Sequence, residues 1–472
     1  MQTAAFFDLD RTLLRGASGP AFSAAMKAEG LLPDRSIPGE ALVFKVFDVI
    51  GETIPSMIAT RQMARAAAGW ERARVQAAGR AAAAELVDAV PGFARQQIAH
   101  HRSLGHPVVM ATTSPHDLVE PLAKALGMEA VIATRYGEVD GRYDGSIDGH
   151  FVWGPGKLAA VRDWAAANDV DVSRSYAYSD SVYDVPLLGA VAHPTAVNPD
   201  PRLQVLAMIR RWPVKHFDVP AAVPKVAGIE PQRALQMLAQ PELFPWVRFD
   251  LDGADLLPRQ GPAIIVANHR SYFDPLAIGY AMGRVDRPVR FLGKKEVFDA
   301  PLVGQVVAAM GGIRVDRGSG SDEPLALAAE ALGAGEAVVI MPQGTIPRGR
   351  ALFDPELKGR WGAAKLARMT GAPVVPIGLW GTERVWPRSS RTPDVLAIGH
   401  PPTVRIRVGR PVSLAGRSLD ADTKRIMAAI VDLLPEEARV RREPTPDELA
   451  RALPAGHRGE PGAEDARRPG SD

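Results

Sequence analysis

The sequence predicts an α/β protein built from two separate, mostly parallel sheets. In each half of the 472-residue chain, short apolar runs that stop at polar loops alternate with stretches of helical spacing. This alternation is typical of parallel strands whose faces are covered by helices. Eight prolines between residues 199 and 245 interrupt the pattern and divide the two halves. The length also fits two or three domains of roughly 100–200 residues each.

In the N-terminal half, a long helical region separates the first predicted strand from the rest. Residues 18–100 are rich in Ala, Arg, Met and Glu and are divided into helices by prolines. The dipeptides Asp140-Gly141 and Asp144-Gly145 predict a hairpin. The apolar runs predicted as strands are 4–7, 107–111, 130–134, 175–178 and 191–196.

The C-terminal half shows a second set of apolar runs from about residue 246. They predict strands at 263–267, 289–292, 337–341, 374–378 and 403–408. Residues 420–434 follow as an amphipathic helix. Beyond about 440 the chain is mostly Pro, Gly and charge, so a disordered tail is expected.

Composition excludes several classes of function. Lys and Arg number 56 against 54 Asp and Glu, so no strong positive field indicates nucleic-acid binding. The absence of cysteine excludes disulfides, thiolate catalysis and Cys-ligated zinc. No window approaches the roughly 18–20 apolar residues of a spanning helix, and the N-terminus lacks the features of a signal peptide. We therefore expect a cytoplasmic protein whose membrane contact, if any, is peripheral.

Two aspartates, Asp8 and Asp10, follow the first predicted strand directly. In an extended chain, residues i and i+2 point the same way, and two carboxylates held together repel and raise one pKa. A Mg²⁺ ion bound by the first carboxylate relieves this repulsion and leaves the second to hold a proton as a general acid and base. The pair is the equipment for covalent phosphoryl transfer to an aspartate.

Three further parts of that chemistry follow strand ends or open helices in chain order. Thr112 supplies a hydroxyl and backbone N–H for phosphoryl oxygens, and Lys157 supplies a cation. Asp180 and Asp184 supply more carboxylates for a metal. Ligands of parallel sheets bind at the carboxyl ends of the strands, so we expect these side chains to meet there.

This set of motifs resembles the haloacid-dehalogenase phosphatase superfamily, in the branch that includes phosphoserine phosphatase, over residues 4–205. The resemblance implies a Rossmann-like sheet with a helical cap at about 18–100 that selects the substrate. It implies Asp8 as nucleophile, Asp10 as acid and base, and Thr112 and Lys157 as phosphate-binding residues. The implied Mg²⁺ ligands are Asp8, Asp10, Asp180 and Asp184. A glycine pair common after the threonine in phosphoserine enzymes is absent, which leaves the substrate open.

In the C-terminal half, His269 and Asp274 flank four residues just after the strand at 263–267. The aspartate can accept from one ring nitrogen, so that the other deprotonates a hydroxyl for attack on a thioester. Taken alone, the histidine could simply cap a helix. Two further segments favour the catalytic interpretation. Arg314 and Arg317 follow a glycine pair, and the loop Met341–Thr345 after a buried strand offers backbone N–H groups.

These blocks resemble the glycerophospholipid acyltransferase family, which includes lysophosphatidate acyltransferase, over residues 246–415. The resemblance implies a His269–Asp274 dyad, an acyl-CoA or acyl carrier protein donor and a lysophospholipid acceptor. The implied acceptor-phosphate residues are Arg314, Arg317, Gly344 and Thr345, and Arg348 is added as a candidate from the anion-binding loop. The family usually has Glu before Gly-Thr and Arg directly after, where this chain has Gln343 and the later Arg348.

The segment between the halves, 206–245, is predicted as a linker, and residues 416–472 as a helix and tail. Residues 202–217 combine arginines with Leu, Ile, Met and Trp. They fit either a surface-bound membrane element or an ordinary interdomain helix, and Phe244-Pro245-Trp246 carries the same ambiguity. The combined prediction is a bifunctional enzyme of phospholipid assembly at the inner face of the cell membrane. The alternatives are an idle phosphatase scaffold or sensor, and a phosphatase of soluble substrates beside an impaired acyltransferase.

Overall fold

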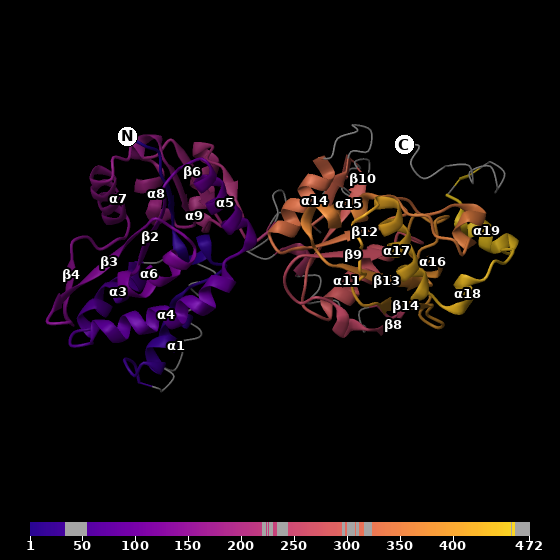
Figure 1. The fold of residues 1–472 in the computed structure, drawn as a ribbon, viewed down its shortest axis with the longest axis horizontal. Coiled ribbons are helices and arrows are strands. Elements are labelled where there is room, and N and C mark those ends of the chain that lie inside the picture. The colour runs from indigo at the N-terminus through magenta and orange to yellow at the C-terminus, as the bar shows by residue number, and fades with distance from the viewer. Residues whose placement is uncertain are drawn as a thin grey trace. The chain divides into compact units, whose positions relative to one another are not determined.

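The computed structural model describes residues 1–33, 54–219, 244–294, 311–315 and 323–454, with 223, 225, 230–233, 298, 299, 307, 456 and 457. The chain divides into two compact units, Met1–Ala221 and Ala222–Asp472, which run from indigo to magenta and onward to yellow in Figure 1. Within the described residues, each unit holds one seven-stranded, mainly parallel sheet, which confirms the predicted α/β class. Among the described residues, no helix has both the length and the apolar character needed to span a bilayer.

The sheet of the first unit has the strand order β4-β3-β2-β1-β5-β6-β7. Its strands are β1 (Ala5–Phe7), β2 (Val108–Pro115), β3 (Ala130–Val139), β4 (Arg142–Asp148), β5 (Tyr176–Ser179), β6 (His193–Val197) and β7 (Val214–Lys215). All pairs are parallel except β3–β4, the predicted hairpin. The carboxyl ends of β1, β2 and β5 therefore lie side by side.

Helices cover both faces of this sheet. They are α1 (Gly19–Ala28), α3 (Ile54–Ala66), α4 (Arg72–Ala89), α5 (Gly92–Ser103), α6 (His116–Ala125), α7 (Pro155–Ala167), α8 (Val185–Leu188) and α9 (Pro201–Arg210), with the short turns η1 (Leu9–Leu13), η2 (Val172–Arg174) and η3 (Val182–Asp184). Phe7 packs in one core with α1, α4, α5 and α6, whereas Phe6 packs in the other with α7, α8 and α9. The predicted cap region is helical where described, and residues 34–53 lie outside the described part.

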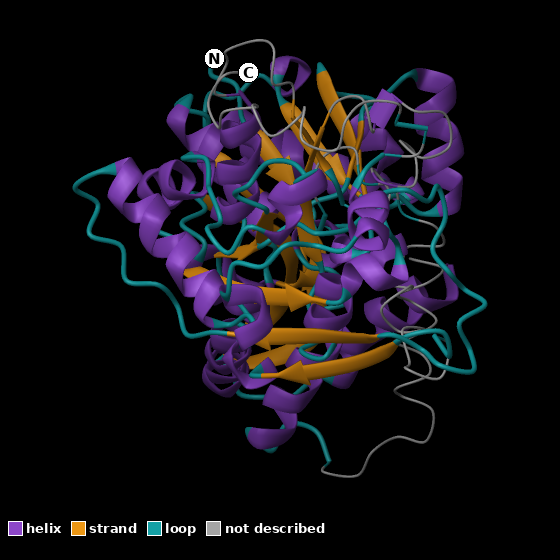
Figure 2. Ribbon diagram, turned by 90° about the vertical axis from the view of Figure 1, so that its right-hand side faces the viewer, coloured by secondary structure: helices purple, strands orange, loops and turns teal. Residues whose placement is uncertain are grey.

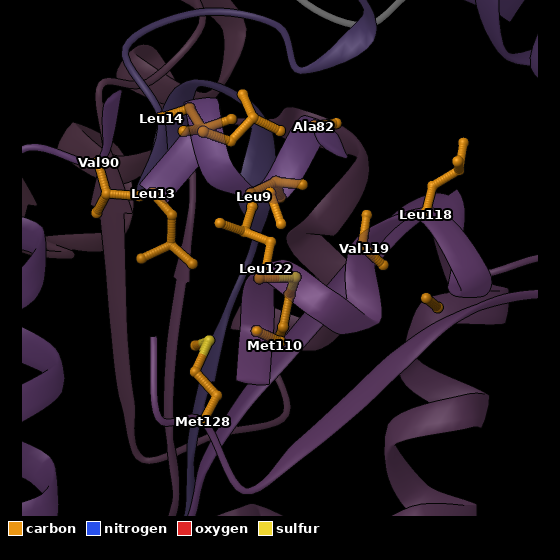
Figure 3. Packing of buried hydrophobic residues seen from close by; sticks show 14 of the residues in the cluster. Leu9, Leu13, Leu14, Ala82, Val90, Met110, Leu118, Val119, Leu122 and Met128 are labelled. Carbon is orange, nitrogen blue, oxygen red and sulfur yellow. The ribbon is translucent and has the colours of Figure 1, made fainter. Parts of the chain in front are cut away.

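Buried leucines hold the turn after β1 in place. Leu9 and Leu13 of η1 are fully buried, and Figure 3 shows them near Met110 and Leu122 in the packed cluster. Burying a leucine side chain contributes roughly 1.5–3 kcal/mol. These contacts therefore anchor the short segment that carries Asp8 and Asp10.

The sheet of the second unit has the order β11-β10-β12-β9-β13-β14-β8. Its strands are β8 (Arg248–Asp252), β9 (Ala263–Ala267), β10 (Val289–Lys294), β11 (Ile313–Val315), β12 (Ala337–Ile340), β13 (Val374–Trp380) and β14 (Thr403–Val408). The pair β13–β14 is antiparallel and the others are parallel. The carboxyl ends of β12, β9 and β13 consequently share one edge, which we call the dyad edge.

Helices also sandwich this second sheet. They are α11 (Asp274–Gly283), α14 (Glu323–Gly333), α15 (Gly362–Thr370), α16 (Thr382–Val385), α17 (Leu419–Asp432), α18 (Glu436–Arg439) and α19 (Pro446–Ala452), with the turns η5 (Ala254–Leu256) and η6 (Gly349–Phe353). Ile265 faces α11, whereas Ile264 faces α14, α15 and α17. Figure 1 shows α11 below β9 and β12 and α14 above them, and Figure 2 shows helices flanking the strands.

The structure corrects the expected disorder beyond residue 440. Residues 446–452 form α19, which begins with a capping box between Thr445 and Glu448. Its last residue, Ala452, is buried against Ile346 and Leu352. A reciprocal cap and a small apolar contact were enough to order a segment of otherwise polar composition. Residues 458–472 lie outside the described residues.

The two segments with an ambiguous membrane interpretation differ in their packing. Trp246 packs edge-on against Phe273 in the second core, which favours a structural role for that segment. In α9, Leu203 is buried while Met208 and Ile209 are 70% and 73% exposed. Residues 202–217 therefore keep both interpretations. Of the predicted linker, residues 220–222, 224, 226–229 and 234–243 lie outside the described residues.

Candidate functional sites

A buried lysine joins two of the predicted aspartates in the first unit. Lys157, near the start of α7, donates to Asp8 Oδ1 at 2.8 Å and to Asp184 Oδ2 at 2.6 Å. The lysine side chain is 1% exposed. A buried ammonium is stable only when paired, and the two carboxylates provide that pairing. The structure thus brings together the predicted nucleophile, the cation and one metal-ligand candidate.

Asp184 is held from a second side by Ser179, the last residue of β5. Ser179 Oγ donates to Asp184 Oδ2 at 2.7 Å. The other oxygen, Asp184 Oδ1, is buried and has no hydrogen-bond partner. Sequence reasoning passed over Ser179, although its place at a strand end beside Asp180 was a usable signal.

Asp180 contacts an arginine that sequence reasoning also missed. Arg11 Nε lies 3.3 Å from Asp180 Oδ2, and Arg11 has a positive φ of 57°. Asn198 Nδ2 donates to the Arg11 carbonyl at 2.9 Å, which helps to hold this strained backbone. The loops after β1, β5 and β6 are therefore tied to one another.

Asp10, in η1, and Thr112, in the last part of β2, lie at the same edge of the sheet, each with a partner of its own. Asp10 Oδ1 accepts the Ser18 N–H at 2.5 Å, just before α1. Thr112 is buried, and its Oγ1 accepts the Ser114 N–H at 3.3 Å. The Thr113 hydroxyl is buried without a hydrogen-bond partner. A substrate phosphoryl group at this loop would give that hydroxyl an acceptor.

Among the described residues, one group of His and acidic side chains that could hold a metal ion lies outside the predicted set. His116, Asp117 and Glu120 place ligand atoms within 4.8 Å of one another. Burial alone would raise the pKa of Asp117, but hydrogen bonds from His116, Arg72 and Tyr143 hold that pKa well below its usual range. Asp117 is therefore an ionised link between α4, α6 and β4, which explains its position without a metal.

In the second unit, the predicted dyad forms directly. His269 Nδ1 lies 2.7 Å from Asp274 Oδ2. The aspartate is fully buried and the histidine side chain is 20% exposed. A hydrogen bond from Nδ1–H to the carboxylate leaves Nε2 as the basic nitrogen. This is the tautomer that can accept a proton from an alcohol.

The loop between the two residues aims the carboxylate. Asp274 Oδ2 also accepts the Arg270 and Ser271 N–H groups at 2.6 and 2.9 Å. Asn268 exchanges two hydrogen bonds of 2.8 Å with the backbone of Leu379 in β13. Asn268 and Ser271 were not predicted as site residues, although both lie inside the motif.

Gln343, the departure from the usual Glu, contacts the dyad directly. Its Oε1 accepts the His269 N–H at 2.7 Å. An amide oxygen can make this bond as a carboxylate oxygen would, so the substitution preserves the acceptor while it removes the charge. Gly344 follows with a φ of +74°, and a Cβ there would lie 3.0 Å from Arg360 Nε. The tight turn thus requires glycine.

A buried arginine ties the dyad loop to the end of β13 and to α16. Arg270 Nε lies 3.1 Å from Glu383 Oε2 of α16, and the guanidinium carbon lies 4.1 Å from the ring centroid of Trp380, the last residue of β13. The ion pair and the cation–aromatic contact both stabilise this position of the dyad loop. This arginine was not singled out by sequence, because an Arg beside a catalytic His has no distinctive spacing.

The remaining predicted phosphate residues are placed only in part. Thr345 lies in the loop after β12, and half-buried Arg348 precedes η6. Arg314 lies on β11, but its side chain is outside the described residues, as is Arg317. Their proposed roles stay predictions.

Comparison with known proteins agrees with this division. Residues 5–189 match the family of haloacid dehalogenase-like hydrolases, and residues 248–380 match the acyltransferase family. A probable phosphatase of Mycobacterium tuberculosis is 36% identical over 224 residues, which cover 47% of this chain and 78% of that protein. A phosphoserine phosphatase of the same organism is 32% identical over 222 residues, which cover 46% and 72%.

The C-terminal half is similar to a chloroplast 1-acyl-sn-glycerol-3-phosphate acyltransferase of Brassica napus. The two are 31% identical over 181 residues, which cover 38% of this chain and 48% of the plant protein. This chain thus spans about half the length of that relative. The chain belongs to the haloacid dehalogenase-like hydrolases in its N-terminal part and carries a domain of the acyltransferase family in its C-terminal part.

Proposed function

We propose that the C-terminal unit transfers a fatty acyl group from acyl-CoA or acyl carrier protein to a lysophosphatidate-like acceptor. The observation that carries the proposal is the 2.7 Å contact between His269 Nδ1 and the buried Asp274 carboxylate. His269 Nε2 takes the proton of the acceptor hydroxyl, and the hydroxyl oxygen attacks the thioester carbonyl. The C–S bond then breaks, an ester forms, and the proton passes to the leaving thiolate.

Supporting the acceptor assignment is the loop after β12. Gly344 adopts a left-handed conformation beside Arg360, and half-buried Thr345 and Arg348 follow. In our proposal this loop, with Arg314 and Arg317, binds the acceptor phosphate. Arginine and backbone N–H groups are the donors that phosphate recognition favours.

We further propose that the N-terminal unit hydrolyses a phosphomonoester through a phospho-aspartate. An Asp8 oxygen attacks phosphorus, the ester P–O bond breaks, and Asp10 gives its proton to the leaving oxygen. Water then attacks the phospho-Asp8 phosphorus with Asp10 as base, and phosphate leaves. Lys157, already within 2.8 Å of Asp8, offsets the charge of the transferred group.

The donor set of this unit fits a Mg²⁺ ion. Asp8, Asp10, Asp180 and Asp184 bring four carboxylates, of which Asp8 and Asp184 contact Lys157 and Asp180 contacts Arg11. The buried Asp184 Oδ1 also has no hydrogen-bond partner. Oxygen ligands with excess negative charge suit a hard divalent cation. When bound, Mg²⁺ would neutralise charge on the phosphoryl oxygens.

The test is one lipid assay with two variants. Purified protein is incubated with lysophosphatidate, oleoyl-CoA and Mg²⁺, and the products are followed by mass spectrometry. We expect phosphatidate from wild type and from Asp8→Asn but not from His269→Ala. Formation of diacylglycerol by wild type but not by Asp8→Asn would place both units in one pathway. Unchanged lysophosphatidate in every sample would refute the acceptor assignment.

A generic aryl phosphate separates an active phosphatase from an idle scaffold. Wild type with Mg²⁺ should release phosphate, and EDTA or Asp8→Asn should abolish the release. Turnover of the aryl phosphate without any acyl transfer would favour the alternative of a soluble-substrate phosphatase beside an impaired acyltransferase. We place the working enzyme at the inner surface of the cell membrane, because a lysolipid acceptor resides there.

A further inference from the structure

We propose that the acyltransferase unit docks on an anionic lipid bilayer through a loop between β13 and β14, residues 394–398, which we call the docking loop. The inference rests on the proposed transfer to a lysolipid acceptor and names the surface through which that site meets its substrate. It concerns the second unit alone.

The docking loop exposes three large apolar side chains within four positions. Val395, Leu396 and Ile398 are 45%, 85% and 59% exposed. Single exposed apolar residues are common on soluble proteins, but a contiguous group marks a surface that associates with something apolar. Water contact with this group is unfavourable, and insertion into the acyl boundary of a bilayer would remove it.

The loop is also held in shape. Asp394 Oδ1 accepts the Leu396 N–H at 3.1 Å, and the Leu396 carbonyl accepts the Ile398 N–H at 2.7 Å. The Asp394 N–H in turn donates to the Val385 carbonyl at 2.9 Å. These turns present the apolar side chains outward instead of letting them fold back on the surface.

Sheet topology places the loop at the dyad edge. Strand β13 runs parallel to β9, and it pairs antiparallel with β14 so that Trp380, at its end, lies opposite Arg405. The connection between β13 and β14 must therefore leave and return at the edge where β9 ends. That is the edge from which His269 and Asp274 project.

The docking loop is joined to the dyad loop through Trp386, which follows the Val385 that accepts the Asp394 N–H. The Tyr272 ring lies 5.7 Å from the Trp386 ring, and Trp386 Nε1 donates to the Ser390 carbonyl at 3.2 Å. Ser271 Oγ donates to the Trp386 carbonyl at 2.6 Å. A bilayer that receives the docking loop would thus lie next to the histidine that must reach the acceptor hydroxyl.

Other side chains of the dyad edge fit a bilayer surface better than a protein partner. Tyr272 is 46% exposed and Trp361, after the loop that carries Gly344, is 57% exposed. Tyrosine and tryptophan favour the headgroup region of bilayers. Arg384 and Arg391, which both precede the docking loop in the connection between β13 and β14, are exposed cations. They attract anionic headgroups and oppose the approach of a second copy of the same surface.

Vesicle sedimentation of the full chain tests the proposal. The vesicles contain either phosphatidylglycerol with phosphatidylcholine or phosphatidylcholine alone. We expect wild type to bind the anionic vesicles, and Leu396→Asp with Ile398→Asp to weaken that binding at least about tenfold. Met369→Asp is the matched control, because Met369 is 49% exposed at the end of α15, which leads into the opposite edge of the sheet.

Acyl-transfer rates separate this inference from the proposed function. On a short-chain lysophosphatidate dissolved as monomers, the loop variant should match wild type, whereas on vesicle-borne acceptor it should be about tenfold slower. Equal vesicle binding by wild type and the loop variant, or no binding by either, overturns the docking loop whatever the enzyme acylates. Conversion of a dimer to a monomer by the loop variant, with vesicle binding unchanged, would assign the loop to a second copy instead.

Discussion

Replacing Asp274 by Asn isolates the charge beneath His269 while it nearly preserves shape. One carboxylate oxygen, Oδ2, accepts from His269 Nδ1 and from the N–H groups of Arg270 and Ser271, at 2.6–2.9 Å. In Asp274→Asn the amide oxygen must occupy this position, because an NH₂ group would face three donors. The NH₂ group then replaces Oδ1, which is buried without a partner.

The magnitude follows from those contacts. A hydrogen bond to a charged group contributes about 1.5–3 kcal/mol and a neutral one about 0.5–1.5 kcal/mol. Three bonds therefore lose about 3–4.5 kcal/mol together if they are additive. An unsatisfied buried NH₂ costs about 1–3 kcal/mol more. The imidazolium that forms during proton transfer also loses its counter-charge, and general-base catalysis is worth about 10²–10⁴ in rate.

The assay compares Asp274→Asn with Asp255→Asn, a change at an exposed aspartate of the same unit. We expect kcat for acyl transfer to fall by about 10²–10⁴ and the melting temperature to fall by roughly 10 °C or more. The exposed control should change neither quantity. A lowered melting temperature with kcat within a few-fold of wild type would mean that Asp274 only supports the loop, and the dyad argument would fail.

Three further predictions concern the other contacts. Lys157→Met should abolish aryl-phosphate turnover and destabilise the first unit by about 3–5 kcal/mol, as breaking a buried ion pair does; calorimetry should show acyl transfer and the second unit unchanged. Gln343→Ala leaves the His269 N–H without its acceptor and should slow acyl transfer about tenfold, whereas Gln343→Glu should stay within a few-fold of wild type. Similar rates for wild type and both variants would show that Gln343 does not position His269. Burial, with the nearby charge of His106, lowers the pKa of His101 from 6.5 to about 4. Because the unfolded chain binds that proton first, the first unit should lose stability as pH falls from about 6.5 to 4, and His101→Gln should flatten this slope in thermal melts.

Much of the fold could be predicted because its strands are buried on both faces. The continuous apolar run Ala263–Ala267 is β9, with the predicted bounds, and Thr403–Val408 is β14. The edge strand β8 was missed, because Arg248–Asp252 alternates charge with apolar residues and no position in it is fully buried. A strand that gains little from burial leaves a weak pattern in the sequence.

In the site, contacts within one sequence motif could be predicted, whereas contacts between distant segments could not. His269 and Asp274 could be paired from sequence because only four residues separate them. The pair closes across a loop and not across a helical turn, because α11 begins at Asp274. The contact of Gln343 with His269 joins residues 74 positions apart, and it exists because β12 pairs with β9 so that Ile340 lies opposite Val266. Adjacent parallel strands deliver their following loops to one place, and the strand order is not written in either motif. The catalytic roles themselves stay predictions until the variants are measured.

The two sites hold their central carboxylates with different groups, backbone N–H groups in one and a lysine side chain in the other. This difference determines whether each site needs a further ligand before it can react. Asp274 is oriented by backbone N–H groups of its own loop. The dyad is therefore aligned before the acyl donor or the lysolipid acceptor binds. Asp8 and Asp184 are instead both held by the ammonium of the Lys157 side chain, which lies between these two negative groups. A phosphoryl group arriving at Asp8 competes with that carboxylate for the ammonium, and the charge left at Asp184 then requires another cation. For this reason we expect phosphate turnover, but not acyl transfer, to depend steeply on divalent metal.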